Sequence, residues 1–311
     1  MNRKSIIVLG ASGMLGSMVL DYFARHTGHA VAATVRNAQL IGKIQALYPD
    51  VELSRLDAEA TNGSAGLEAA LAGADWVINA IGVIKPFAQD NNPEHIEHAV
   101  RVNADFPHRL ARLAEARGLR VLQIATDCVY SGSEGRYGES AKHDPLDVYG
   151  KTKSLGESLL PCVSNLRCSI IGPETKGFVS LLDWFRRQPR GAQLNGFSNH
   201  YWNGITTLQF ARICQGVIDR ELPLPHVQHV VPADHIAKAD LLESFKLEWR
   251  RDDIAIKHIE VQPVVDRTLS TEDEELNRKL WQAAGYERPP AIETMVGELA
   301  GYDCQLAGAL A

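Results

Sequence analysis

Apolar and polar positions along the first half of the chain repeat in the rhythm of an α/β protein. Short runs rich in Val, Ile, Leu and Ala are separated by amphipathic stretches, which is typical of buried parallel strands joined by helices. The predicted strands are SIIVLG (5–10), AVAATV (30–35), VELSRL (51–56), DWVINAIG (75–82), RVLQIAT (120–126) and LRCSII (166–171). Between the first two, apolar residues recur at three- and four-residue spacing and predict a helix over 14–26.

This alternation favours right-handed crossovers and a doubly wound parallel sheet. We therefore expect an α/β fold with a Rossmann-type domain over residues 1–172. After Pro173 the rhythm changes to aromatic and polar loops, a helix-like run over 207–217 and a proline-rich bend, ELPLPH. Residues 173–311 are predicted to form mainly a smaller C-terminal substrate-binding lobe, and the terminal AGALA is predicted to fray.

Composition narrows the class of protein. The 311 residues are 45% hydrophobic, and 32 Lys and Arg stand against 38 Asp and Glu for a net charge of −6, which does not favour a nucleic-acid partner. No apolar run approaches the about 20 residues that span a bilayer, and the opening apolar stretch is short for a signal peptide. We expect a cytoplasmic protein without a membrane partner. Five cysteines without a Cys-x-x-Cys pair predict neither a disulfide framework nor a metal site.

A glycine-rich turn follows the first predicted strand. Its pattern is Gly-x-x-Gly-x-x-Gly at the start of the predicted helix, where glycine lets the backbone approach a pyrophosphate held by helix N–H groups. The residues expected to bind the dinucleotide are Gly10, Ser12, Gly13, Met14, Leu15 and Gly16.

Arg36 indicates which dinucleotide is bound. It stands twenty residues after Gly16, near where an acidic residue would hold the ribose 2′-hydroxyl of NAD. A guanidinium there can instead pair with a 2′-phosphate. The sequence therefore favours NADP(H), with a surface arginine that ends a strand as the alternative.

Tyr149 and Lys153 form a candidate catalytic pair. Their spacing places both on one face of a helix. A phenol of pKa near 10 is a poor acid–base catalyst at neutral pH unless a neighbouring ammonium lowers its pKa. Upstream, the segment from Ala125 to Gly132 reads ATDCVYSG and closes the fifth predicted strand.

Together these motifs resemble the extended short-chain dehydrogenase/reductase family and, more narrowly, its dTDP-4-dehydrorhamnose reductase branch. The Thr126–Gly132 segment resembles the branch's Ser/Thr-Asp-x-Val-Phe/Tyr-x-Gly, and LRCSIIG (166–172) its sixth strand. NGITT (203–207) is similar to the segment with which the family returns to its first domain, which implies a return near 204–220. The resemblance fades after Phe210.

The resemblance implies roles for individual residues. Tyr149 would donate a proton to a carbonyl oxygen, Lys153 would lower its pKa and bind the nicotinamide ribose, and Thr126 would orient the substrate. Asn103 matches a family asparagine, for which a structural amide is an equal interpretation. The other residues expected to line the cofactor are Asp57, Ala80, Ile81, Gly82 and Ala125.

The second half offers residues for a nucleotide sugar, because flat rings, amides and cations suit a nucleobase and a diphosphate. Related GDP-fucose synthases use a cysteine at the position of Cys128 together with a histidine. The loop GPETKGF supplies no such histidine, so Cys128 is interpreted as a pocket-lining residue. The expected substrate-binding residues are Lys85, Asp127, Cys128, Trp184, Arg187, Asn195, Trp202 and Arg267.

The expected function is NADPH-dependent reduction of a nucleotide-activated 4-keto-6-deoxy sugar. A sugar-nucleotide epimerase, alone or combined with a reductase, is one alternative, and Asp127-Cys128 argues against a dehydratase. A non-catalytic NADP-binding subunit is another, because the regulatory β subunit of methionine adenosyltransferase has this reductase fold. A homodimer is one arrangement among those that the sequence leaves open.

Overall fold

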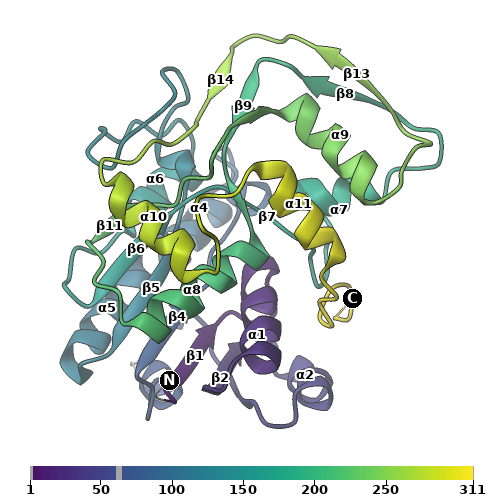
Figure 1. Ribbon diagram of the computed structural model, residues 1–311. Coiled ribbons are helices and arrows are strands. Elements are labelled where there is room, and N and C mark those ends of the chain that lie inside the picture. Colours follow the sequence, from purple (N-terminus) through teal and green to yellow (C-terminus); the bar gives the residue numbers. More distant parts are fainter. Residues whose placement is uncertain (1–2, 61–64, 311) are drawn as a thin grey trace.

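A seven-stranded parallel sheet forms the centre of the molecule (Figure 1). The structure, a computed structural model, describes residues 3–60 and 65–310. The strands lie in the order β11-β6-β5-β4-β1-β2-β3. They are β1 (Ser5–Leu9), β2 (Ala30–Val35), β3 (Glu52–Arg55), β4 (Trp76–Asn79), β5 (Arg120–Ala125), β6 (Val163–Arg167) and β11 (Val227–His229). The order reverses between β1 and β4, so the predicted doubly wound fold is confirmed.

Helices cover both faces of this sheet because successive strand residues point to opposite sides. Ile6 and Val8 face one core, and Ile7 and Leu9 face the other. The first core receives α1 (Met14–His26), α2 (Ile41–Leu47), α8 (Thr207–Arg220) and α10 (Glu274–Ala283). The second receives α3 (Ala65–Ala70), α4 (Pro93–Ala99), α5 (Phe106–Arg117) and α6 (Val148–Leu155). Short helical turns are η1 (Ala38–Leu40), η2 (Lys85–Phe87), the π-helical η3 (Val100–Asp105) and η4 (Asp127–Val129).

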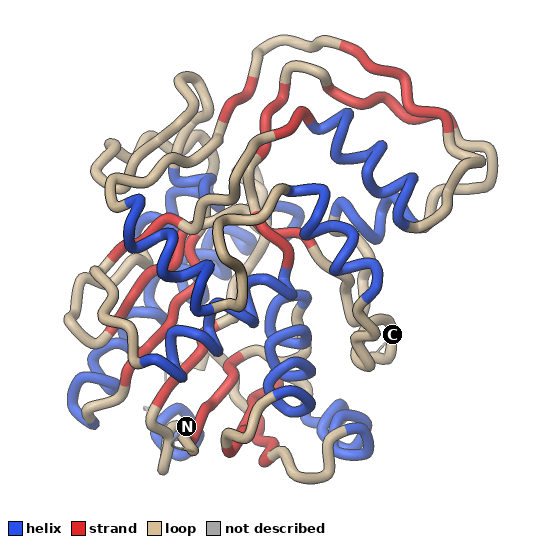
Figure 2. The backbone as a smooth tube through the Cα atoms, viewed as in Figure 1, coloured by secondary structure: helices blue, strands red, loops and turns tan. Residues whose placement is uncertain are grey.

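The remaining elements build a second layer beyond the sheet (Figure 2). Strand β9 lies between β12 and β14, β8 pairs with β13, and β7 pairs with β10. The strands are β7 (Ile170–Ile171), β8 (Gln193–Phe197), β9 (His200–Trp202), β10 (Ile205–Thr206), β12 (Ile236–Ala237), β13 (Ala255–Ile259) and β14 (Val265–Asp266). The helices are α7 (Leu181–Arg186), α9 (Lys238–Glu248) and α11 (Ile292–Gly301).

Two details of the sheet differ from the sequence prediction. The run LRCSII is not one strand: β6 starts at Val163 and ends at Arg167, and Ile170–Ile171 leave the sheet to pair with β10. The chain also returns to the sheet through α8, which packs on α1, and through β11, which pairs with β6. β11 was not predicted, because a strand of three residues carries too little periodicity.

The predicted fraying of the C-terminal segment is wrong for its described residues. Leu306 and Leu310 are buried. The amide of Gly308 donates to the Glu174 carbonyl at 2.9 Å, and that of Leu310 to the Thr175 carbonyl at 3.3 Å. Backbone hydrogen bonds and buried leucines therefore hold this segment against the loop after β7.

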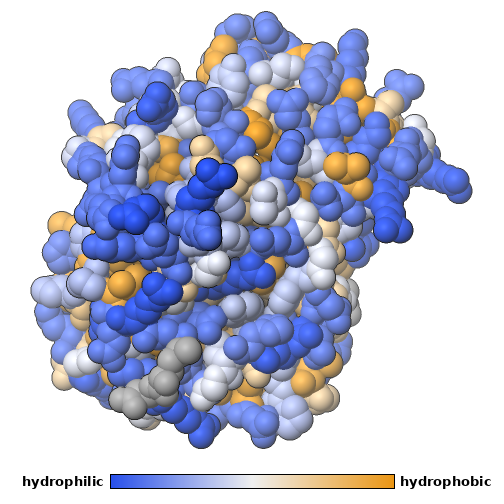
Figure 3. Space-filling view, in the orientation of Figure 1, coloured by the Kyte–Doolittle hydropathy of each residue, from blue (hydrophilic) through white to orange (hydrophobic). Residues whose placement is uncertain are grey.

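On the face shown in Figure 3, apolar residues are scattered among polar ones. Within the ranges 3–60 and 65–310, no helix has the length and apolar character needed to cross a membrane.

Candidate active site

The glycine-rich turn forms a close crossing between β1 and α1. Gly10 has a φ of +84°, which favours glycine. A Cβ on Gly16 would lie 2.2 Å from the Gly10 carbonyl oxygen, so only glycine lets the helix start this near the turn. The N-cap residue Gly13 makes no side-chain cap hydrogen bond, and the first turn of α1 has no acidic residue. These features suit the binding of an anion at the helix N-terminus.

The carboxyl ends of β2, β3 and β4 lie at the same edge of the parallel sheet as the glycine-rich turn. Arg36 follows β2 and is exposed, and Arg55, the last residue of β3, donates from Nε to the Arg36 carbonyl at 3.3 Å. Arg55 was not predicted from the sequence, because a lone arginine at a strand end forms no motif. The Asp57 carboxylate accepts the Glu59 amide at 3.1 Å. A Cβ on Gly10 would contact Ile81, so the loop at 80–82 borders the glycine turn.

Asn103 is engaged in structural hydrogen bonds. Its amide accepts the Val83 N–H at 2.8 Å and donates to the Val83 carbonyl at 2.9 Å. It also donates to Thr152 on α6 at 3.3 Å. The side chain thus ties the loop after β4 to the helix that carries Tyr149 and Lys153.

Helix α6 presents Tyr149 to the turn after β5. Asp147 caps the helix by accepting the Gly150 N–H at 2.8 Å. A Cβ on Gly150 would lie 2.2 Å from the Cys128 carbonyl oxygen, which lets α6 press against η4. Burial raises the pKa of Tyr149, and the Thr126 hydroxyl partly offsets that rise. This direction is opposite to the lowering expected from Lys153, and a raised pKa makes the phenol a weaker acid.

Lys153 lies one helical turn after Tyr149 and is buried. Its ammonium donates to the Ile124 carbonyl at 2.9 Å. Burial lowers the pKa of Lys153 to about 8, with Glu157 acting in the opposite direction. The two members of the predicted pair thus lie on one short helix, at the carboxyl end of β5.

Asp127 and Cys128 complete the turn. The Thr126 hydroxyl donates to the Asp127 carboxylate at 3.1 Å and accepts the Cys128 N–H at 3.2 Å. Burial raises the pKa of Asp127 and raises that of Cys128 to about 12. The thiol is therefore neutral at physiological pH and is not a ready base.

Cationic side chains surround this turn. The Lys85 ammonium lies 2.8 Å from the Asp147 carboxylate and 5.9 Å from the centre of the Tyr149 ring. Arg267 donates from Nε to the Tyr130 carbonyl at 3.0 Å. Lys238, at the start of α9, is near enough for its pKa to be affected by Asp127 and Arg267. Lys238 was not predicted from the sequence, because nothing around it in IAKAD forms a motif.

The substrate-binding residues predicted in the second lobe are more dispersed than those around Tyr149. Trp184 on α7 is 40% exposed, and the Arg187 guanidinium lies 3.3 Å from the centre of the Phe178 ring. Asn195 is exposed on β8. Trp202 is buried and donates its indole N–H to Ser169 at 2.9 Å, so its ring packs inside the lobe.

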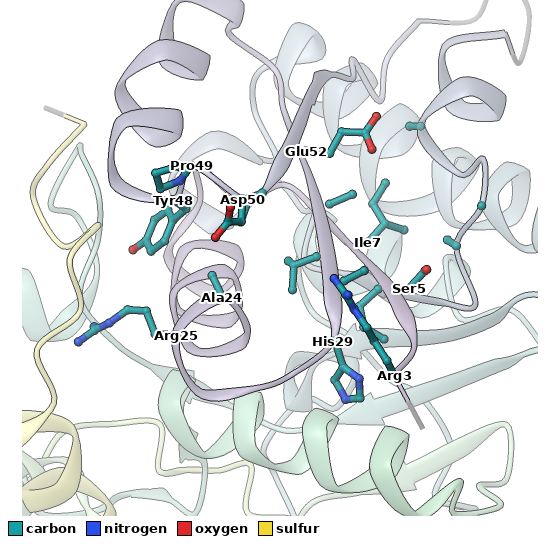
Figure 4. Close-up of a pocket in the computed structure, with 18 of the residues that line it drawn as sticks. Arg3, Ser5, Ile7, Ala24, Arg25, His29, Tyr48, Pro49, Asp50 and Glu52 are labelled. Carbon is teal, nitrogen blue, oxygen red and sulfur yellow. The ribbon is translucent and has the colours of Figure 1, made fainter. Parts of the chain in front are cut away.

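A cleft of about 500 Å³ opens at the other edge of the sheet (Figure 4). It is bordered by the amino ends of β1 and β2, with Arg3, His29, Asp50 and Glu52 around it. Open α/β sheets bind their ligands at the carboxyl ends of the strands, so this cleft is separate from the Tyr149 site. Within the described ranges, no group of three or more His, Cys, Asp or Glu side chains could hold a metal ion.

Comparison with known proteins decides the family. The family model described as RmlD substrate binding domain matches residues 3–299 of this chain. The chain belongs to this family. The family therefore accounts for both the sheet and the lobe, and the predicted resemblance to dTDP-4-dehydrorhamnose reductases is confirmed.

Proteins similar in sequence to this chain include both a subunit of methionine adenosyltransferase 2 and a dTDP-sugar reductase. Methionine adenosyltransferase 2 subunit beta of Bos taurus is 29% identical over 161 residues, 50% of this chain and 42% of that protein. The dTDP-4-dehydrorhamnose reductase of Streptomyces griseus is 32% identical over 156 residues, 50% of this chain and 44% of that protein. These matches thus span less than half the length of either relative.

The fold is also found in solved structures. The dTDP-4-dehydrorhamnose reductase of Bacillus anthracis, in complex with NADP, aligns with a TM-score of 0.71 over 96% of this chain and 99% of that one. Its sequence identity is 14%, so the likeness concerns the fold.

Proposed function

We propose that the protein reduces the 4-keto group of a nucleotide-activated 4-keto-6-deoxy sugar with NADPH. The observation that carries the proposal is the placement of Tyr149 and Lys153 on α6, against the turn after β5, on the same edge of the sheet as the glycine turn. The family and the reductase from Streptomyces griseus support a sugar-nucleotide substrate.

The residues present fit NADP. Gly10 and Gly16 leave a cradle that a Cβ would fill, and Arg36 with Arg55 offers cationic groups at the ends of β2 and β3. The Bacillus anthracis reductase of the same fold was solved with NADP. The glycine turn would hold the pyrophosphate, the arginines the 2′-phosphate, and Lys153 the nicotinamide ribose. When bound, NADPH supplies the hydride.

Tyr149 acts on the substrate carbonyl. Its hydroxyl donates a proton to the oxygen of the 4-keto group as negative charge develops there. Thr126, one residue beyond β5, orients the same oxygen by turning its hydroxyl away from Asp127, to which it donates in the absence of substrate. The Lys153 ammonium stabilises the phenolate that remains, because a positive charge near an oxygen anion lowers its energy.

The test is single-turnover oxidation of NADPH by the purified protein with dTDP- and UDP-linked 4-keto-6-deoxy sugars. A burst of NADPH oxidation that produces the 4-hydroxy sugar supports the proposal. NADPH binding without oxidation by any of these sugars contradicts it.

A binding subunit without catalysis is the second candidate, favoured by the similarity to methionine adenosyltransferase 2 subunit beta. It predicts NADPH binding without turnover, together with complex formation with a methionine adenosyltransferase from the same organism. Size-exclusion chromatography of the mixed proteins distinguishes this candidate from the reductase. The neutral thiol of Cys128 does not favour an epimerase in which this cysteine acts as the base.

A further inference from the structure

Arg167 is a buried arginine at the carboxyl end of the central sheet. It is the last residue of β6 and pairs with Ala125 of β5. Alternate residues of a strand point to the same side of a sheet, so Arg167 shares the side of Val163, which packs in the core that α6 covers. The guanidinium therefore points to the side of the sheet that carries Tyr149 and Lys153.

The guanidinium of Arg167 uses its full set of donors. A guanidinium has five N–H groups. Nε and one terminal nitrogen donate to the two carboxylate oxygens of Glu157, at 3.1 and 2.6 Å, and the same terminal nitrogen donates to His143 at 3.0 Å. The other terminal nitrogen donates to the Tyr130 hydroxyl at 2.6 Å and to His229 at 2.8 Å. A lysine ammonium, with three N–H groups on one nitrogen, cannot reproduce this set.

His229 accepts from Arg167 because of where its own proton lies. Its Nδ1 is 2.7 Å from the Ser270 carbonyl, which accepts hydrogen bonds and donates none. Nδ1 therefore carries the proton, and Nε2 is left to accept. Burial and, next, the charge of Arg167 lower the pKa of His229 to about 4. Burial also lowers the pKa of His143, so Glu157 is the anion among these partners.

Glu157 and Tyr130 connect Arg167 to the two sides of the candidate site. Glu157 follows the end of α6, and its carboxylate is near enough to Lys153 to raise the pKa of that lysine. Tyr130 is the residue at which the η4 turn ends, and Thr126 is the residue at which that turn is capped. One guanidinium thus holds both the chain that leaves α6 and the chain that leaves the turn facing it.

Stability alone does not explain an ion pair buried at this place. The side chains of Arg167 and Glu157 are 1% and 7% exposed, and removing two charges from water costs free energy that apolar side chains would not cost. A bidentate pair supplies direction as well as attraction, because the planar guanidinium matches two carboxylate oxygens. We therefore interpret the pair by the segments that it holds in place.

We propose that Arg167 is a positioning residue for the proposed reduction: through Glu157 and Tyr130 it fixes α6 against the η4 turn and so sets the place of Tyr149 beside that turn. The inference rests on the proposed function for the reaction that is affected. Its geometric part, the fixed placement of α6, is independent of that reaction.

Tyr130→Phe tests the contact on the side of the turn, since it removes the hydroxyl and keeps the ring. We expect it to slow single-turnover NADPH oxidation about tenfold at saturating NADPH and sugar, because a small displacement of a reacting group slows the chemical step. The half-saturating concentrations should stay within about twofold of wild type, because ground-state binding is retained.

Tyr286→Phe is the matched control. The Tyr286 hydroxyl also accepts from an arginine, Arg212, at 2.7 Å, and its ring packs against the core on the other side of the sheet. This variant should keep the wild-type rate even where it lowers the melting temperature as much as Tyr130→Phe does. Equal slowing by the two variants contradicts the proposal.

Glu157→Gln tests the contact on the side of the helix. It should also slow the reaction, and Glu298→Gln, at the carboxylate that pairs with Arg212, is its control. Because both contacts act through one guanidinium, the double variant of Tyr130→Phe and Glu157→Gln should be little slower than the slower single variant. Two fold-changes that multiply in the double variant contradict the proposal.

The pKa of Lys153 provides a measurement without substrate. An NMR titration of isotope-labelled lysine reports this pKa, which burial lowers to about 8 and which Glu157 and the Cys168 thiol both raise. Tyr130→Phe alters the charge of neither group. If α6 is loosened, water reaches the ammonium, and the pKa of Lys153 should rise toward its ordinary value of 10.5. Tyr286→Phe should leave this pKa unchanged.

The two measurements separate this inference from the proposed reaction. If no 4-keto sugar oxidises NADPH but Tyr130→Phe raises the pKa of Lys153, the placement by Arg167 stands and the proposed reaction is wrong. If wild type reduces the sugar, and Tyr130→Phe keeps either the wild-type rate or the wild-type pKa of Lys153, the positioning role is wrong and the reaction stands. Without turnover and without a change in this pKa, both are wrong.

Discussion

At the scale of the residue, Tyr149 owes its proposed role to where α6 places it. The residue is flanked by Thr126 and Cys128, and burial raises its pKa, so it holds its proton at neutral pH. A reduction needs that proton at the moment when the carbonyl oxygen becomes negative.

Replacing Tyr149 with Phe removes this proton and little else. We expect single-turnover NADPH oxidation to slow by roughly 10²–10⁴-fold, the range for loss of an acid–base catalyst, with fold and NADPH affinity retained. Stopped-flow absorbance at saturating sugar measures the rate, and Tyr201→Phe is the control. Wild-type turnover in Tyr149→Phe would refute the proton-donor role.

Arg36 is expected to select the cofactor. If its guanidinium pairs with the 2′-phosphate, Arg36→Ala weakens NADPH binding by about 1.5–3 kcal/mol, as for a hydrogen bond to a charged group, and leaves NADH binding nearly unchanged. Fluorescence titration with both cofactors measures the difference, and Arg112→Ala on α5 controls for loss of a surface charge. Equal weakening of both cofactors contradicts this role.

Lys153 makes stability depend on pH. Burial lowers its pKa from 10.5 to about 8, so between these values the unfolded chain binds a proton that the folded protein does not. Folding therefore becomes more favourable as pH rises through this window. Relative to Lys153→Met, the free energy of unfolding of wild type should rise by up to about 3 kcal/mol from pH 7 to pH 10.5, at about 1.4 kcal/mol per pKa unit.

Urea unfolding at both pH values measures this rise. Lys151→Met, an exposed lysine on the same helix, is the control and should show the pH dependence of wild type. If Lys153→Met shows the same rise as wild type, titration of Lys153 is not the source of the pH dependence, and the prediction is wrong.

At the scale of the element, the start of α1 depends on Gly16. Alanine is favoured over glycine inside a helix by about 1 kcal/mol, yet a Cβ at Gly16 would lie 2.2 Å from the Gly10 carbonyl oxygen. We expect Gly16→Ala to displace the turn, lower the melting temperature and abolish NADPH binding. Gly42→Ala in α2, where a Cβ meets nothing within 4 Å, is the matched control. Scanning calorimetry measures the melting temperature, and cofactor titration measures NADPH binding. A Gly16→Ala variant with the melting temperature and NADPH affinity of wild type would contradict this prediction.

The sequence predicted those strands and helices in which apolar residues repeat over enough positions to form a clear pattern. The first five strands and α1 follow from apolar runs that the two faces of the sheet bury. Strand β6 was misplaced because LRCSII looks continuous, although Cys168 and Ser169 separate β6 from β7. Lys238 comes near Asp127 only in the folded chain, a long-range proximity that no local motif encodes. The same limit explains Trp202, whose aromatic ring suggested an open platform but is enclosed.

At the scale of the whole molecule, the last described residues connect distant parts of the chain. Tyr302 donates to the buried Asp21 carboxylate of α1 at 2.6 Å, and the Gln305 amide donates to it at 3.0 Å. Further on, Leu310 bonds to Thr175, whose hydroxyl donates to the Ser12 carbonyl at 2.7 Å. The segment after α11 thus braces α1 and the loop beside the glycine turn.

Tyr302→Phe tests how much this bracing stabilises the protein. Asp21 is fully buried and pairs with Arg25, so loss of one donor should lower the free energy of unfolding by about 1.5–3 kcal/mol, as for hydrogen bonds to charged groups. Tyr22→Phe is the matched control, since its hydroxyl donates to the neutral Gln215 amide at 2.8 Å and should cost only about 0.5–1.5 kcal/mol. NADPH affinity should stay unchanged in both variants, because the glycine turn keeps its bond to Thr175. Equal losses of stability in the two variants, measured by urea unfolding, would show that the charge of Asp21 does not strengthen the contact with the C-terminal segment.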